Sequence, residues 1–167
     1  MIKLLIYNSQ IGYFMFQVLI FLMALVAVIP GSFTYASDTS NQLGTIEFPT
    51  SSSGAAQKHF IRGVAALHSF WYTQALNAFE QSTIADPDFA MGYWGLAMSH
   101  NHTLWEDQDK KSAREALSKI TEISKLTQRE QDYIHAVRLL YGDEKKQMDD
   151  KAYSKAMENI YHNYPND

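Results

Sequence analysis

The chain has 167 residues, a formal net charge of −4 at pH 7 and no cysteine. The lack of cysteine excludes a disulfide scaffold, a thiolate metal site and a cysteine nucleophile. The acidic balance argues against nucleic acid as a partner, because neutralising phosphate groups requires a basic surface. With four prolines and eight glycines, the composition is that of a folded globular chain and not of a collagenous or disordered one.

The N-terminal 36 residues have the features of an export signal. Lys3 precedes an apolar stretch whose densest part covers residues 18–29, and Thr34-Tyr35-Ala36 presents small residues where a signal peptidase would cleave before Ser37. The alternative is an uncleaved membrane anchor, since residues 11–29 approach the ~20 that span a bilayer. We expect an exported protein, periplasmic or extracellular, that meets the membrane only if this segment stays attached.

The remainder divides into a polar linker and a helical domain. Residues 37–54 are rich in serine and threonine, with one apolar island, Ile46-Glu47-Phe48-Pro49, that we expect to pack on the first helix. From residue 55 to residue 167, apolar side chains recur at steps of three and four, which predicts helices. No stretch alternates with period two, so no sheet is expected.

The sequence also marks helix boundaries. Asp86-Pro87 resembles an N-cap followed by proline at the first helical position, and predicts a helix from Asp88 to about His102. Apolar residues at 117, 120, 123 and 126 predict the next helix. Thr127-Gln-Arg-Glu130 predicts a capping box that opens a fifth helix, and residues 152–161 predict a sixth.

An internal repeat indicates how these helices are organised. The tetrad His68-Ser-Phe-Trp71 recurs as His102-Thr-Leu-Trp105, an offset of 34 residues, and Gly63 maps to Ala97 at the same offset. A 34-residue period built from two helices is typical of a stacked helical-hairpin solenoid. We therefore expect an all-α, right-handed solenoid of about three antiparallel helix pairs, with hairpins at about 55–86, 87–125 and 127–164.

On these residues the chain resembles the tetratricopeptide repeat (TPR) family. Residues 57–87 carry the family pattern most fully, the second unit keeps it through its first helix, and the third unit, 127–164, matches weakly. The resemblance implies that small residues let paired helices approach and that aromatics fill the gap to the next pair; Ala75 is expected to face Gly63. The repeat-packing residues so implied are Gly63, Tyr72, Ala75, Phe79, Pro87, Trp94 and Ala97.

The chain is also similar to a group of exported bacterial TPR proteins of unknown activity. The similarity rests on the segments LGTIEFPTSSS, ALHSFWYTQALNAFEQ, ADPDFAMGYWGLAMSHNHTLWE and QREQDYIHAVRLLYGD. These relatives continue into further repeats. One alternative is therefore that this chain is the non-binding N-terminal part of a longer TPR protein.

Histidines and carboxylates are the candidates for chemistry. His68, His100 and His102 suggest a metal-binding or enzymatic protein as a second alternative, but residues two apart on a helix point about 200° apart. We expect the turn-motif residues His68, Trp71 and His102 to be structural. Acidic pairs such as Asp86 and Asp88 stand where they would cap helices. No catalytic motif is present, so we expect no enzyme, no cofactor and no metal site.

The favoured function is a scaffold that binds a protein or peptide. Stacked hairpins present the first helix of each pair on a concave surface, and aromatic and arginine residues are the usual anchors of binding. The candidate groove residues are His59, Arg62, Tyr93 and Trp105. Self-association through the last hairpin is a further expectation, because Tyr153, Met157 and Tyr161 spread wider than one helical stripe.

Overall fold

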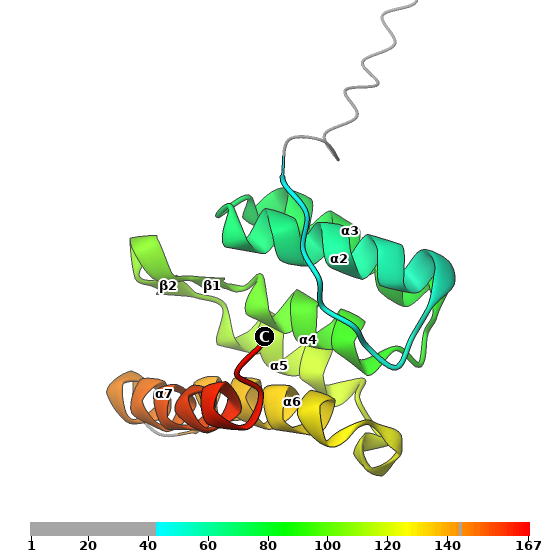
Figure 1. The fold of residues 1–167 in the computed structure, drawn as a ribbon. Coiled ribbons are helices and arrows are strands. Elements are labelled where there is room, and N and C mark those ends of the chain that lie inside the picture. Colours follow the sequence, from blue (N-terminus) through cyan, green and yellow to red (C-terminus); the bar gives the residue numbers. More distant parts are fainter. Residues whose placement is uncertain (1–42, 144) are drawn as a thin grey trace, which may run out of the picture. The chain divides into compact units, whose positions relative to one another are not determined.

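A computed structural model describes residues 43–143 and 145–167. The expected signal segment, residues 1–36, and the first part of the linker, residues 37–42, lie outside the described residues. The described part contains six α-helices, which Figure 1 shows in chain order. They are α2 (Gly54–His68), α3 (Tyr72–Ala85), α4 (Ala90–Met98), α5 (Lys110–Ser118), α6 (Gln128–Leu140) and α7 (Lys146–Asn163).

Most helices contact the next helix along the chain. Helix α2 contacts α3, α3 contacts α4, α4 contacts α5, and α6 contacts α7, and we call α2 with α3, α4 with α5, and α6 with α7 the three pairs. Helix α4 also contacts α2 and α6, so the first helices of the three pairs are neighbours in the described part of the chain (Figure 1). The described part is mostly helical, in agreement with the predicted all-α class. None of its helices combines the length and hydropathy that crossing a membrane requires.

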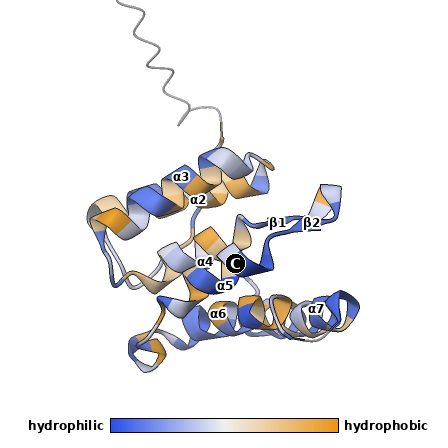
Figure 2. Cartoon of the chain, turned by 180° about the vertical axis from the view of Figure 1, so that it is seen from behind, coloured by the Kyte–Doolittle hydropathy of each residue, from blue (hydrophilic) through white to orange (hydrophobic). Residues whose placement is uncertain are grey.

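The expectation of no sheet is wrong in one place. Strand β1 (Asn101–His102) pairs antiparallel with β2 (Asp107–Gln108), around a 3₁₀ turn at Thr103–Trp105. Glu106 takes a left-handed conformation (φ 52°) that turns the chain back. Strands of two residues are too short to show a period-two pattern, which is why the sequence did not reveal them. Both strands are hydrophilic, as Figure 2 shows.

Two helices differ from the expectation: α4 is shorter, and α5 lies earlier in the chain than residues 117–126. The amide of Asp88 donates to the Asp86 carboxylate (3.2 Å), which makes a turn at Pro87, and α4 begins only at Ala90. Helix α5 ends at Ser118, and a separate 3₁₀ turn covers Ile123–Lys125. Apolar residues three apart suit a 3₁₀ turn as well as an α-helix, so spacing alone did not separate the two.

The predicted capping box at the start of α6 is confirmed. The Thr127 hydroxyl accepts from the backbone amide of Glu130 (3.3 Å), and the Glu130 carboxylate accepts from the backbone amide of Thr127 (3.1 Å). Two otherwise unpaired helix-start amides are thereby satisfied.

Phe79 is the centre of the packing between the first two helix pairs. Its ring is fully buried and lies against both Gly63 of α2 and Gly95 of α4. A methyl group added at Gly63 would come within 2.6 Å of the Phe79 ring, and one at Gly95 within 2.2 Å. The atoms nearest to such a methyl group at Gly63 belong to Phe79, and the expectation that Ala75 faces Gly63 stays a prediction. Ala75 is nevertheless fully buried.

An ion pair with a buried carboxylate joins the second and third pairs. Lys110 Nζ of α5 lies 2.6 Å from the Asp149 carboxylate of α7, whose side chain is only 4% exposed. The Tyr141 hydroxyl, at the end of α6, donates to the backbone carbonyl of Ala97 in α4 (2.7 Å). These contacts fix α6 and α7 against the pair that precedes them.

Substituting Gly95→Ala tests the packing around Phe79. The new methyl group would overlap the buried ring, so we expect a loss of about 1–3 kcal/mol in the free energy of unfolding, measured by chemical denaturation. Combining Gly95→Ala with Phe79→Leu should cost less than the sum of the two single changes, because the smaller side chain vacates the contested space. Strictly additive costs would show that the two residues are not in contact.

Candidate functional site

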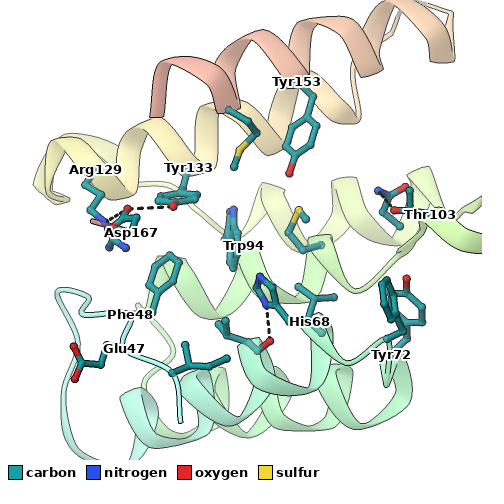
Figure 3. Close-up of a pocket in the computed structure, with 17 residues that line it drawn as sticks. Glu47, Phe48, His68, Tyr72, Trp94, Thr103, Arg129, Tyr133, Tyr153 and Asp167 are labelled. Atoms are coloured by element: carbon teal, nitrogen blue, oxygen red, sulfur yellow. Dashed lines mark hydrogen bonds and ion pairs between the residues drawn. The ribbon is translucent and has the colours of Figure 1, made fainter. Parts of the chain in front are cut away.

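A groove of about 570 Å³ lies on the side of the molecule formed by the first helices α2, α4 and α6. Its walls include residues from these helices, from α7, from the turns that follow α2 and α4, and from the extended segment that precedes α2 (Figure 3). It is lined by Ile46, Glu47, Phe48, Val64, Leu67, His68, Phe70, Tyr72, Trp94, Met98, Asn101, Thr103, Arg129, Tyr133, Tyr153, Met157 and Asp167.

The extended segment anchors itself in the groove through Phe48. The Phe48 ring packs on three other aromatic rings, with centroid distances of 5.3 Å to Phe60, 5.9 Å to Trp94 and 5.2 Å to Tyr133. The three rings come from α2, α4 and α6, so one side chain of the segment touches all three first helices. The expectation that the apolar island packs on the first helix is confirmed, and the contact is wider than expected.

Polar contacts hold the backbone of the same segment. The side-chain amide of Gln57 donates to the Phe48 carbonyl (2.8 Å), and the Arg129 guanidinium donates to the Pro49 carbonyl (2.9 Å). The Ser51 amide donates to the Glu130 carboxylate (2.8 Å). The end of the segment next to α2 is therefore fixed to α2 and to α6.

Glu130 is fully buried and has unusual surroundings for a carboxylate. Burial by itself raises the pKa of Glu130, but hydrogen bonds from Ser51 and Thr127 outweigh it and leave the pKa below its ordinary value of 4.5. The carboxylate is thus charged at neutral pH and stabilised by donors from the extended segment (Ser51) and from the start of α6 (Thr127).

One end of the groove is polar. Arg129 Nε lies 2.6 Å from the Asp167 carboxylate, to which the Tyr133 hydroxyl also donates (3.1 Å; Figure 3). The Arg129 guanidinium stacks over the Phe48 ring at 4.2 Å. Burial, together with the Asp167 charge, raises the pKa of Tyr133 to about 12, so its hydroxyl remains a donor. Arg129 is therefore already neutralised within the chain.

The opposite end carries neutral polar groups near Tyr72 and Thr103 (Figure 3). His68 donates from Nδ1 to the Val64 carbonyl (2.9 Å), because a carbonyl can only accept. Phe70 has a left-handed backbone (φ 59°) and a half-exposed side chain at this end. Such a conformation is strained for a bulky residue, and strain of this kind is often found at binding sites.

Two polar groups at the groove make no hydrogen bond within the described residues. The Trp94 indole N–H is buried without an acceptor, although its ring makes aromatic contacts on either side. The Tyr153 hydroxyl makes no hydrogen bond there either, and burial raises its pKa. An unpaired buried donor is costly, so Trp94 is held in place by its ring packing and not by its nitrogen.

None of the four candidate groove residues predicted from the sequence lines this cavity, and their role in binding stays a prediction. His59, Arg62, Tyr93 and Trp105 are not among the residues that line the groove. Tyr93 donates its hydroxyl to the Pro87 carbonyl (3.0 Å), and Trp105 is 64% exposed. Of the residues expected to pack between repeats, Tyr72 and Trp94 also line the groove.

The residue that follows the first turn tetrad packs on the second tetrad. Tyr72, which follows the first tetrad, packs on His102 of the second at a centroid distance of 4.4 Å and on Trp105 at 5.9 Å. Their large apolar side chains remain exposed: Phe70 by 50%, Trp71 by 37% and Leu104 by 63%. The tetrads therefore form an apolar surface at one end of the groove.

The turn histidines have separate partners. His68 bonds to a backbone carbonyl of its own helix, whereas His102 Nδ1 lies 3.0 Å from the Asp107 carboxylate. Burial lowers the pKa of His100, which favours its neutral form. Among the described residues, no group of three or more histidines and carboxylates is placed to hold a metal ion.

Sequence reasoning missed most of the groove wall. Arg129 and Tyr133 are four residues apart and share one face of α6, next to the predicted capping box. That spacing was visible in the sequence, but nothing in it showed that this face meets Phe48. Comparison with protein-family models, with curated proteins and with solved structures gave no match.

Substituting Glu130→Gln tests the attachment of the segment. The amide would present N–H groups to the donors of Ser51 or Thr127, so we expect a loss of about 1–3 kcal/mol in unfolding free energy at pH 7. Because the folded-state pKa is lowered, this stabilisation is present above pH 4.5 and is lost as the pH falls through the folded-state pKa. The difference in unfolding free energy between wild type and variant should therefore become smaller at acidic pH. A difference that stays constant as the pH falls would contradict this role.

Proposed function

We propose that this chain is an exported, TPR-like, right-handed solenoid of three helix pairs that binds an extended segment of a protein or peptide partner. The packing of α2 with α3, α4 with α5 and α6 with α7 supports the pairing. So does the contact of the first helices with one another, since first helices line the concave surface of a stacked-hairpin array. Export rests on residues 1–36 of the sequence.

The observation that carries the proposal is the extended segment already seated in the groove. It shows the two kinds of contact that peptide recognition uses: an aromatic side chain, Phe48, among rings from three helices, and backbone carbonyls held by Gln57 and Arg129. The same surface can bind a second extended segment, from a partner, next to the first one, because about 570 Å³ of the groove stays unfilled.

A blocked groove tests this function. Random peptides of about 12 residues, displayed and selected on the full-length chain, should yield binders. The substitution Leu67→Trp fills the groove wall and should weaken those binders at least about tenfold, which corresponds to losing about 1.4 kcal/mol of binding free energy.

Leu76→Trp is the matched control. Leu76 is half-buried like Leu67, but it lies on α3 and not among the groove residues. Binding should survive this change. Failure to select any peptide, or equal losses from both substitutions, would count against a peptide-binding groove.

A further inference from the structure

The extended segment has a free backbone edge. Within the described residues, the backbone N–H and C=O groups of Thr45, Ile46 and Glu47 make no hydrogen bond. The first anchored carbonyl is that of Phe48, which accepts from Gln57. An extended segment with unpaired backbone groups is a template for a second strand.

This edge borders the unfilled part of the groove. Ile46, Glu47 and Phe48 all line it, and Leu67, Met98 and Met157 contribute apolar side chains to it from α2, α4 and α7. All three of these side chains are half-buried and pack on the core. Methionine adapts its shape to an incoming side chain more readily than a branched residue does. The site is therefore suited to a large apolar side chain.

The charged side chains at the groove favour a partner with a positively charged residue. Glu47 is exposed and has no ion-pair partner within the described residues. Arg129, the groove's cation, is already paired with Asp167 and bonded to the Pro49 carbonyl. An incoming lysine or arginine would find an unpaired carboxylate, whereas an incoming acid would have to displace Asp167.

We propose that the groove binds its partner by strand addition, in which the partner pairs with the extended segment as a second strand; this inference rests on the proposed function. An extended polypeptide pairs with the edge of residues 45–47 that carries the backbone groups of Thr45 and Glu47. It inserts a large aliphatic or aromatic side chain among Leu67, Met98 and Met157, and places a lysine or arginine beside Glu47. Backbone pairing supplies affinity without regard to sequence. The apolar side chain and the basic residue supply selectivity.

The peptides selected on the full-length chain provide the first test. They should share a large apolar residue with a nearby lysine or arginine. Methylating one backbone nitrogen at a time should weaken binding at alternate positions, because successive amides of a strand point to opposite sides. We expect losses of about tenfold at the sensitive positions, the effect of one net hydrogen bond. Loss at almost every interior position, as a helical ligand would give because its amides bond within the helix, or at none, would overturn strand addition.

Variants at Glu47 provide the second test. Glu47→Pro removes a backbone N–H that has no partner in the free chain, whereas Glu47→Ala removes the same carboxylate and keeps the N–H. Thermal unfolding of both should match wild type. Glu47→Ala should reduce the preference for basic peptides, and Glu47→Pro should weaken binding by a further factor of about ten.

The outcomes separate this inference from the function on which it rests. Suppose that peptide binding is weakened by Leu67→Trp and preserved in Leu76→Trp, but that the Glu47→Pro and Glu47→Ala variants bind the peptides with equal affinity. The groove then binds peptides, and strand addition at Glu47 is wrong. If the selected peptides are acidic, the predicted partner chemistry is wrong. If no peptide is selected, both the proposed peptide binding and strand addition are wrong.

Discussion

The buried carboxylate of Glu130 joins parts of the chain that are 79 residues apart, because it accepts hydrogen bonds from Ser51 as well as from Thr127. The same side chain closes the start of α6 and fixes the segment that precedes α2. Without this contact the segment would keep the ring contacts of Phe48 and the hydrogen bonds from Gln57 and Arg129, but it would lose its attachment at Ser51. A charge buried at this depth is tolerated only because each of its donors is in place, so the arrangement of the groove wall depends on it.

The helix packing beneath the groove follows from the absence of side chains at two positions. Gly63 and Gly95 let α2 and α4 approach the same ring, Phe79, from two directions. The closeness of these helices brings Phe60 and Trp94 near enough to receive Phe48 between them. The packing of α2 and α4 against Phe79 on one side thus determines the distance between the groove walls on their opposite side.

Local features were predictable from the sequence, and features that depend on distant contacts were not. The capping box at Thr127 and Glu130 could be predicted, because its donors and acceptors are three residues apart. The packing of Phe48 near α2 could be predicted because an apolar island in a polar linker must be buried somewhere. Arg129 and Met157 could not be placed in the groove, since that requires knowing how α6 and α7 are rotated against α4. The two-residue strands β1 and β2 depend on the pairing of a loop with itself and have no periodicity of their own.

Phe48 is connected to the start of α2 by only the residues between 48 and 54, and this short tether has a consequence for competition. Tethering on this scale corresponds to an effective concentration in the millimolar range. A free peptide that carried the same aromatic anchor would have to exceed that concentration, or bind far more tightly, before it could replace the chain's own ring. The aromatic site beneath Phe48 is consequently closed to weak ligands, and selection among partners falls to the part of the groove that the segment leaves open.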